Sequence, residues 1–175
     1  EAYNIFGCNG ILFNHESPRR GETFVTKKIV RALVRIKKRK QKILYLGNLD
    51  SKRDWGHAKD YVVAMWKILQ QKQPEDFVIA TGKQYSIRQF ISLVSKKINM
   101  KIIWRGKGLK EKGYDSITKK PIIAIDKNYI RPLDVNTLLG NASKARKKLS
   151  WKPKINIHKL IDEMIVEEEN ILEND

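Results

Sequence analysis

The sequence contains one cysteine, Cys8, in 175 residues, which excludes an internal disulfide. A lone cysteine in an apolar segment is typical of reducing compartments, where it is more often a small buried residue than a nucleophile. The sequence also lacks an apolar run long enough to span a bilayer and a signal-peptide pattern at its start. We therefore expect a soluble, cytoplasmic protein that does not cross a membrane.

The usual signatures of catalysis are also missing. The histidines His15, His57 and His158 are too scattered for a metal site, and no Cys/His spacing indicates zinc. No Gly-x-Gly-x-x-Gly or Gly-x-x-Gly-x-x-Gly turn follows a predicted strand, which excludes a self-contained dinucleotide site. None of the six tyrosines has a lysine four residues later, and no Gly-x-Ser-x-Gly elbow is found. We expect these 175 residues alone to have no catalytic turnover.

Acidic residues are scarce relative to basic ones. The 36 Lys and Arg residues exceed the 19 Asp and Glu residues by 17 charges. Such a balance is typical of nucleic-acid-binding proteins. However, the lysines lie mostly on predicted exposed helix faces, and no aromatic residues alternate with them as a platform for stacking bases. A solvated basic surface is therefore favoured, and a basic nucleic-acid-binding module stays as the alternative.

Short apolar runs alternate with amphipathic segments, which predicts the α/β class. Strands are expected at 10–13, 43–46, 77–80, 102–104 and 122–125. Helices are expected at 23–41, 55–71, 86–97 and 158–172, with a short one that starts at Asn141 or Ser143 and ends at 149. The fully apolar strand at 77–80 is the type found inside a parallel sheet.

Three local features make specific predictions. Asp54 precedes the helix expected from Trp55 and is predicted to cap its N-terminus. Trp55 itself is interpreted as an aromatic that packs this helix and stays outside the ligand site. Apolar residues at helical spacing on that helix are predicted to form its buried face, namely Val62, Met65, Trp66 and Leu69. The run from Gly106 to Lys120 is rich in glycine and lysine and is expected to be an exposed loop.

Candidate ligand-binding side chains begin where the first predicted strand ends. The segment from Asn14 to Glu22 carries an amide, an imidazole and two guanidiniums, at a position where α/β proteins hold anionic ligands. A guanidinium fits two phosphate oxygens at once, so Arg20 and Arg53 are the strongest candidates for binding a phosphate. Asn14 and His15 line the same strand end, although such a pair can also satisfy the backbone of a turn.

Arg53 and Arg131 each have two interpretations. Arg53 lies beside a predicted helix N-terminus, where the helix dipole adds to an anion-binding field. It could equally form a structural ion pair with Asp54 or Asp60. Arg131 precedes Pro132 and is therefore held in extended backbone. It could pair with Asp134 or reach a ribose and phosphate.

Four blocks of sequence carry a resemblance to a known family: 12–26, 46–62, 74–82 and Arg131-Pro132. The whole chain resembles the C-terminal half of GDP-mannose 4,6-dehydratases, which are extended short-chain dehydrogenases/reductases. This implies that residues 1–175 combine the last elements of a Rossmann-like domain with a smaller nucleotide-sugar-binding domain. The N-terminal NADP-binding half, with its Tyr-x-x-x-Lys helix, would precede Glu1. The start at Glu1 rather than Met likewise predicts a processed or partial chain.

The resemblance implies roles for particular residues. Asn14 would contact the nucleotide sugar, and His15 and Arg20 would reach NADP. The expected substrate-binding residues are Asn14, Arg20, Lys28, Gly47, Arg53, Tyr129, Arg131 and Asp134. Lys28 would meet a phosphate, Arg53 the diphosphate, and Tyr129 and Arg131 the GDP portion. The family usually has Glu where Asp134 stands, and Asp is shorter by one methylene for the ribose or guanine contact that the resemblance implies.

The implied activity is the conversion of GDP-mannose to GDP-4-keto-6-deoxymannose with NADP, a step toward GDP-fucose and related deoxyhexoses. The loop from Ser17 to Gly21 lies near a subunit interface in the family, which implies a homo-oligomer, either a dimer or a tetramer. Two alternatives stay open. One is a dehydratase or epimerase that acts on dTDP- or UDP-sugars, and the other is the basic nucleic-acid-binding module.

Overall fold

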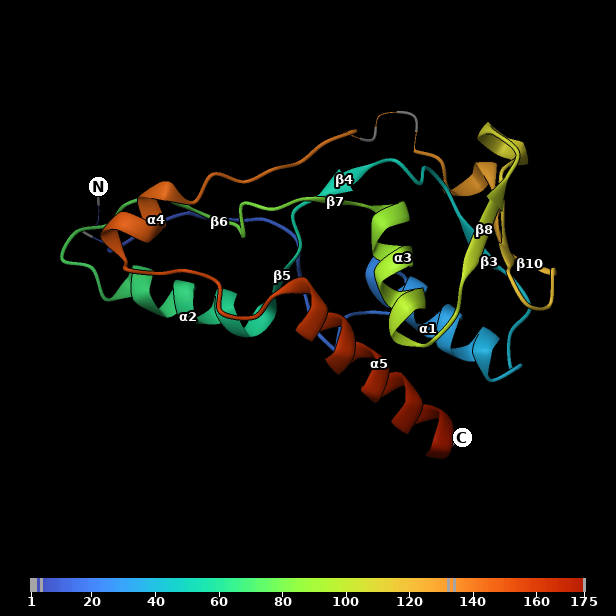
Figure 1. The fold of residues 1–175 in the computed structure, drawn as a ribbon. Coiled ribbons are helices and arrows are strands. Elements are labelled where there is room, and N and C mark those ends of the chain that lie inside the picture. The colour runs from blue at the N-terminus through green and yellow to red at the C-terminus, as the bar shows by residue number, and fades with distance from the viewer. Residues whose placement is uncertain (1–2, 4, 132, 134, 175) are drawn as a thin grey trace.

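The chain forms an elongated α/β structure, and the computed structural model describes residues 3, 5–131, 133 and 135–174. A two-stranded parallel sheet lies toward one end of the molecule and a four-stranded sheet toward the other, each accompanied by helices (Figure 1). Strands and helices alternate along the described residues, which confirms the predicted α/β class.

The parallel pair consists of β1 (Gly10–Leu12) and β6 (Phe77–Ile79), with Ile11 opposite Val78. Helices α2 (Ala58–Leu69) and α4 (Ser143–Lys148) both pack against β6. Tyr61, Phe77 and Trp151 are among the buried side chains of the small core that results. This core fixes the position of β1, whose carboxyl end leads into the predicted ligand-binding segment.

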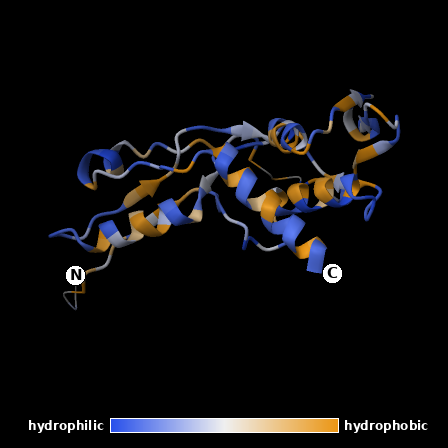
Figure 2. Cartoon of the chain, turned by 60° about the horizontal axis from the view of Figure 1, so that its bottom comes forward, coloured by the Kyte–Doolittle hydropathy of each residue, from blue (hydrophilic) through white to orange (hydrophobic). Residues whose placement is uncertain are grey.

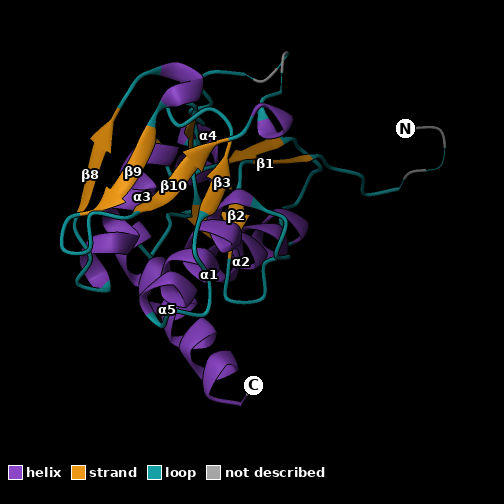
Figure 3. Cartoon of the chain, turned by 90° about the vertical axis from the view of Figure 1, so that its right-hand side faces the viewer, coloured by secondary structure: helices purple, strands orange, loops and turns teal. Residues whose placement is uncertain are grey.

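The four-stranded sheet has the order β3 (Leu44–Leu46), β10 (Pro121–Ile125), β9 (Lys112–Asp115), β8 (Ile102–Arg105). β3 and β10 are parallel, and the other two pairs are antiparallel. Helices α1 (Val25–Lys37), α3 (Ile87–Lys97) and α5 (Ile157–Asn174) pack on one another beside this sheet (Figure 3). Their apolar faces form the larger core, which includes Leu33, Phe90, Ile123 and Leu160.

Short strand pairs connect the two ends. β2 (His15–Glu16) pairs in parallel with β5 (Gly56–His57), and β4 (Lys52–Arg53) pairs antiparallel with β7 (Tyr85–Ser86). Two single-turn helices, η1 (Gly108–Lys110) and η2 (Lys127–Tyr129), flank the four-stranded sheet. Within the described part of the chain, no helix is long and apolar enough to cross a bilayer.

The prediction of an exposed loop from Gly106 to Lys120 was wrong. This stretch contains η1 and all of β9, an inner strand of the sheet between β8 and β10. Gly113 explains the misleading composition, because a Cβ at this position would lie 3.0 Å from Ile102 Cγ2 and 3.2 Å from Ile123 Cβ. The glycine that indicated a loop instead allows the three strands to pack closely.

The prediction that Asp54 caps α2 was also wrong. His57 is the N-cap, and its Nδ1 accepts a hydrogen bond from Lys59 N at 3.0 Å. The fully buried Asp54 carboxylate instead accepts from Thr81 Oγ1 at 2.6 Å, and from the backbone N–H groups of Thr81 and Gly82. Asp54 therefore joins the segment before α2 to the turn after β6. Ser86, the first residue of the helix expected at 86–97, is the N-cap of α3 and forms a capping box with Gln89.

The predicted buried face of α2 lies in solvent instead. Val62, Met65, Trp66 and Leu69 are 56%, 37%, 62% and 59% exposed. The buried side chains are those of Tyr61, Ala64 and Ile68, which belong to the same core as Phe77 and Ile79. Apolar residues occupy more of the surface of α2 than is buried against the core. Helical periodicity alone therefore could not distinguish the buried apolar residues from the exposed ones.

Candidate functional site

A cavity of about 570 Å³ lies where β1, β3 and β10 end and α1 begins. Asn14 comes from the link after β1, Gly47 follows β3, and Tyr129 follows β10. The complete lining consists of Asn14, Thr23, Phe24, Val25, Lys28, Leu46, Gly47, Asn48, Ser51, Arg53, Trp55, Ile87, Asn128, Tyr129 and Arg131. Six of the residues expected to bind substrate thus surround one cavity at strand ends, where α/β folds place ligands.

The charge of the cavity is of one sign. Lys28, Arg53 and Arg131 line it, and no carboxylate stands among its described lining residues. The remaining polar groups are amides and hydroxyls, from side chains such as Asn14, Asn48 and Ser51. Three cations in one partly enclosed space form a site for an anion with several oxygens.

Lys28 and Tyr129 form a contact across the cavity. The Lys28 ammonium lies 3.3 Å from the centre of the Tyr129 ring, within the range of a cation–π interaction. Lys28 belongs to the first turns of α1, whereas Tyr129 ends η2, so the contact joins two elements far apart in the sequence. Tyr129 is half exposed. The ring therefore holds the cation at the cavity without neutralising it.

Gly47 is required by a close backbone approach. A Cβ at this position would lie 2.2 Å from the Tyr129 carbonyl oxygen and 3.1 Å from Ile130 N, which no side chain allows. The atoms nearest to such a Cβ all belong to the protein backbone. The absence of a side chain lets η2 pack against the end of β3 and brings Tyr129 to Lys28.

Arg53 lies in β4 with its side chain partly buried, and its Nη1 donates to the carbonyl of Lys52 at 2.8 Å. The two carboxylates proposed as structural partners have other donors as well. Asp54 accepts from residues 81, 82 and 140, and Asp60 accepts from the backbone N–H groups of Lys154 and Ile155. The position of Arg53 in the cavity wall supports its expected contact with a diphosphate, which stays a prediction.

Trp55 is a wall of the cavity that sequence reasoning kept out of the site. Its ring is 2% exposed and packs in a tilted arrangement on Phe90, with ring centres 5.1 Å apart. The sequence-based interpretation as a packing aromatic is confirmed, and the same ring also borders the ligand space. Asn48, Ser51 and Asn128 were missed as well. In the sequence, only the position of Asn48 and Asn128 shortly after predicted strands indicated that they could line a ligand site.

The sequence of this chain matches one known protein family over most of its length. The family model described as GDP-mannose 4,6 dehydratase matches residues 1–164. The chain belongs to the GDP-mannose 4,6-dehydratase family. It is 52% identical over 177 residues to GDP-mannose 4,6 dehydratase 2 of Caenorhabditis elegans, and 52% identical over 178 residues to GDP-mannose 4,6-dehydratase of Vibrio cholerae. These matches cover 100% and 96% of this chain but 46% and 48% of the relatives. The chain thus spans about half the length of the curated relatives it matches.

Solved structures of lower sequence identity show the same fold. RMD from Pseudomonas aeruginosa, complexed with NADPH, superposes with a TM-score of 0.75 at 18% identity, over 97% of this chain and 50% of that one. The dTDP-glucose 4,6-dehydratase of Bacillus anthracis, in complex with NAD, has a TM-score of 0.71 at 17% identity, over 95% and 45%. The expected likeness to half of an extended dehydrogenase fold is therefore confirmed, while the division into domains stays a prediction.

His15 and Arg20, the residues that the family resemblance assigned to NADP, do not line the cavity. The His15 ring stacks on Tyr61, with centres 4.8 Å apart and planes at 23°. Arg20 Nε lies 3.1 Å from Glu16 Oε2, and the guanidinium carbon lies 3.5 Å from the centre of the Phe24 ring. Arg20 thus contacts Phe24, which lines the cavity, without lining it itself, and its expected contacts with NADP and substrate stay predictions. Asp134, expected at the GDP portion, lies outside the described residues.

Proposed function

We propose that this chain forms the nucleotide-sugar-binding part of a GDP-mannose 4,6-dehydratase. The observation that carries the proposal is the cavity with Lys28, Arg53 and Arg131 in its wall and no described carboxylate. In a chain about 50% identical to GDP-mannose 4,6-dehydratases, the anion that fits such a cavity is the diphosphate of GDP-mannose. The product would be GDP-4-keto-6-deoxymannose, formed with loss of one water.

The chemical groups that line the cavity indicate which part of the reaction this chain would perform. The hydride chemistry of the reaction would be supplied by NADP, held mainly by the part of the family's length that this chain does not span. Among the described residues, the cavity contains cations, amides, hydroxyls and aromatic rings, but no carboxylate or histidine to transfer a proton. Its side chains would therefore bind and orient the nucleotide sugar. Orientation contributes to rate even when the chemistry is performed elsewhere.

The two ends of the substrate would meet different parts of the cavity. Lys28 and Arg53 would hold diphosphate oxygens, while Tyr129 and Arg131 would lie over the GDP portion. The contact between Lys28 and Tyr129 supports this arrangement, because one pair then touches both the charged and the planar parts of the ligand. Asn14, whose backbone carbonyl accepts from Gly56 N at 2.9 Å, would present its amide to the sugar.

Calorimetric titration with GDP-mannose tests this function. We expect the chain to bind GDP-mannose more tightly than dTDP-glucose or UDP-glucose. Lys28→Gln should weaken binding by about tenfold, the loss of one charge-assisted contact that is partly open to solvent. Lys38→Gln removes the same charge from an exposed position at the end of the same helix and should leave affinity unchanged. A folded chain that prefers the dTDP- or UDP-sugar would contradict the proposal, as would equal weakening by both substitutions.

A further inference from the structure

Two of the four tryptophans, Trp55 and Trp151, are almost completely buried, and of these two only Trp55 lines the cavity. Apolar and polar segments alternate along the helices in Figure 2, and the apolar faces of α1, α3 and α5 form the larger core, to which Trp55 and Phe90 belong. The indole ring of Trp55 therefore borders both the core and the cavity, and the core fixes its position.

The indole N–H of Trp55 lacks a hydrogen-bond acceptor. Its Nε1 is buried, and no acceptor for it lies among the residues that the structure describes. Trp151 shows how the same fold accommodates an indole that does not line the cavity: its Nε1 donates to the carbonyl of Asp60 at 2.9 Å. A buried donor without an acceptor destabilises a fold, so most such groups have a partner. Packing alone therefore does not explain the N–H of Trp55.

The order of side chains before α2 places this indole next to Arg53. Arg53 and Trp55 are two residues apart and both line the cavity, as side chains on one side of an extended segment would. Asp54, between them, is directed elsewhere, because its carboxylate accepts hydrogen bonds from the turn after β6. The carboxylate next to Trp55 in the sequence is thus occupied, whereas an anion bound by Arg53 would bring oxygens to the same wall of the cavity.

The chemistry of an indole restricts what its partner could be. The N–H group donates a hydrogen bond and the ring offers no acceptor in return, so the partner is an acceptor atom such as a phosphate oxygen. Lys28, Arg53 and Arg131, which line the same cavity, also carry only donors. A phosphate oxygen has lone pairs for more than one donor, so it can accept from Arg53 and Trp55 together.

We propose that the Trp55 N–H donates a hydrogen bond to a diphosphate oxygen of the nucleotide sugar and thereby positions the diphosphate beside Arg53. This inference rests on the proposed function, because it takes GDP-mannose as the ligand. Trp55 contributes direction and not charge. An ammonium or guanidinium attracts an anion from any side, whereas one N–H on a ring held by the core favours a single position of the oxygen. Because Nε1 is buried, water does not compete for this donor.

Nuclear magnetic resonance of the indole N–H groups tests this contact directly. The isotope-labelled full chain has one indole resonance for each of its four tryptophans, and single Trp→Phe substitutions assign them. Saturation with GDP or with GDP-mannose should move the Trp55 proton resonance downfield, because a hydrogen bond to a charged oxygen deshields the proton. The Trp151 resonance should stay in place, since its N–H already donates to Asp60. A Trp55 resonance that does not move when the ligand is bound overturns the proposal.

Trp55→Phe and Trp151→Phe form a matched pair of variants. Each keeps an aromatic ring and removes one buried indole N–H. In calorimetric titrations, Trp55→Phe should weaken GDP and GDP-mannose alike by about tenfold, the loss of one hydrogen bond to a charged group. Trp151→Phe should leave both affinities unchanged and lower the thermal unfolding temperature, because it removes the hydrogen bond to the Asp60 carbonyl. Equal weakening by the two variants would show that Trp55 acts through packing alone and would overturn the proposal.

The same titrations distinguish the failure of this inference from the failure of the proposed function. If Lys28→Gln weakens the binding of GDP-mannose and Trp55→Phe does not, the Trp55 contact is wrong and the function stands. A loss confined to GDP-mannose would place the acceptor on the sugar and overturn the contact with the diphosphate. If the folded wild-type chain binds neither ligand, both proposals fall. If Trp55→Phe does not fold, the indole resonances of the wild-type chain decide.

Discussion

Glu16 is a carboxyl group held almost out of solvent between β2 and α1. Its residue is 2% exposed, Thr26 Oγ1 donates to it at 2.6 Å, and Arg20 Nε lies 3.1 Å away. Burial raises the pKa of Glu16, and the hydrogen bond from Thr26 and the charges of Arg20 and His15 offset only part of that effect. A carboxyl whose pKa is higher in the folded state stabilises the fold at low pH and loses that contribution as pH rises.

The substitution Glu16→Gln measures this contribution. Gln keeps an acceptor for Thr26 and removes the ionisation, so the stability of the wild type relative to the variant should fall as pH rises. Urea unfolding at about pH 5 and about pH 8 gives the two free energies of unfolding to compare. Glu22→Gln, which changes an exposed carboxyl near the same loop, is the control. If the wild type instead becomes more stable relative to the Gln variant as pH rises from about 5 to about 8, the pKa of Glu16 is lowered and not raised.

At the scale of elements, α1 and α5 are joined by a buried cluster of charges. Glu168 of α5 is 1% exposed, and three cations of α1 approach its carboxylate. Arg35 Nε lies 2.7 Å from Oε1, Arg31 Nε 4.0 Å from Oε1, and Lys27 Nζ 3.9 Å from Oε2. Lys27 also donates to the carbonyl of Pro18 at 3.0 Å. The cluster therefore connects α5 to the loop that precedes α1, the helix that carries Lys28.

Glu168→Gln should destabilise the chain by about 3 kcal/mol, because it leaves the buried Lys27 without its carboxylate. That figure is at the lower end for a broken buried pair, since Arg31 and Arg35 remain partly exposed. Chemical denaturation measures the difference. Glu173→Gln, which changes an exposed carboxylate of the same helix, should alter stability by less than about 0.5 kcal/mol. Equal effects of the two substitutions would show that the cluster adds nothing beyond the charge of α5.

Sequence periodicity predicted where the helices lie along the chain better than it predicted which of their faces are buried against other elements. Every predicted helix exists, although the one expected at 23–41 is α1, Val25–Lys37, and the one at 55–71 is α2, Ala58–Leu69. The failures have two physical causes. Gly113 gave β9 the composition of a loop, and α2 is apolar over more surface than the described chain covers. Composition does not reveal which side of an apolar helix meets which neighbour.

The site shows the same limit. The residues that follow strands, such as Asn14 and Gly47, could be placed from the sequence because strand ends in an α/β sheet converge. Arg20 could not, because its guanidinium contacts Glu16 and the ring of Phe24, and periodicity gives no information on either contact. Trp55 is buried against Phe90 and also lines the cavity, a double role that only three-dimensional packing reveals.

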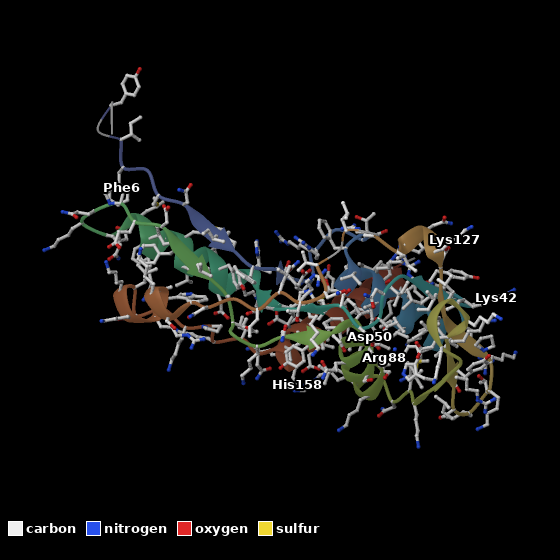
Figure 4. All side chains as sticks on the ribbon, turned by 90° about the horizontal axis from the view of Figure 1, so that it is seen from above. Phe6, Lys42, Asp50, Arg88, Lys127 and His158 are labelled. Atoms are coloured by element: carbon white, nitrogen blue, oxygen red, sulfur yellow. The ribbon has the colours of Figure 1, made fainter. Side chains whose placement is uncertain are left out.

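The whole molecule carries a formal net charge of +17, and many of its lysines lie in exposed positions. Figure 4 shows Lys42 and Lys127 at the outer part of the four-stranded end, and Asp50 and Arg88 next to each other nearer the middle of the molecule. Some basic side chains have anionic partners, as Arg88 has in Asp50 at 3.2 Å and Lys148 in Glu75 at 2.5 Å. The surplus is spread over the surface, whereas the cavity gathers three cations around one space. These two distributions predict different behaviour in salt.

Binding of a DNA duplex and of GDP-mannose, each followed as salt is raised from about 50 to about 200 mM, separates the two distributions. A diffuse basic surface that contacts many phosphates should lose about a thousandfold in affinity for DNA over this range. GDP-mannose, with two phosphates in a partly enclosed site, should lose far less. Lys28→Gln should weaken binding of GDP-mannose with little effect on DNA. DNA binding that persists at the higher salt while GDP-mannose has no effect would instead favour the nucleic-acid-binding module. In that case the cavity cations would belong to a surface for a polyanion.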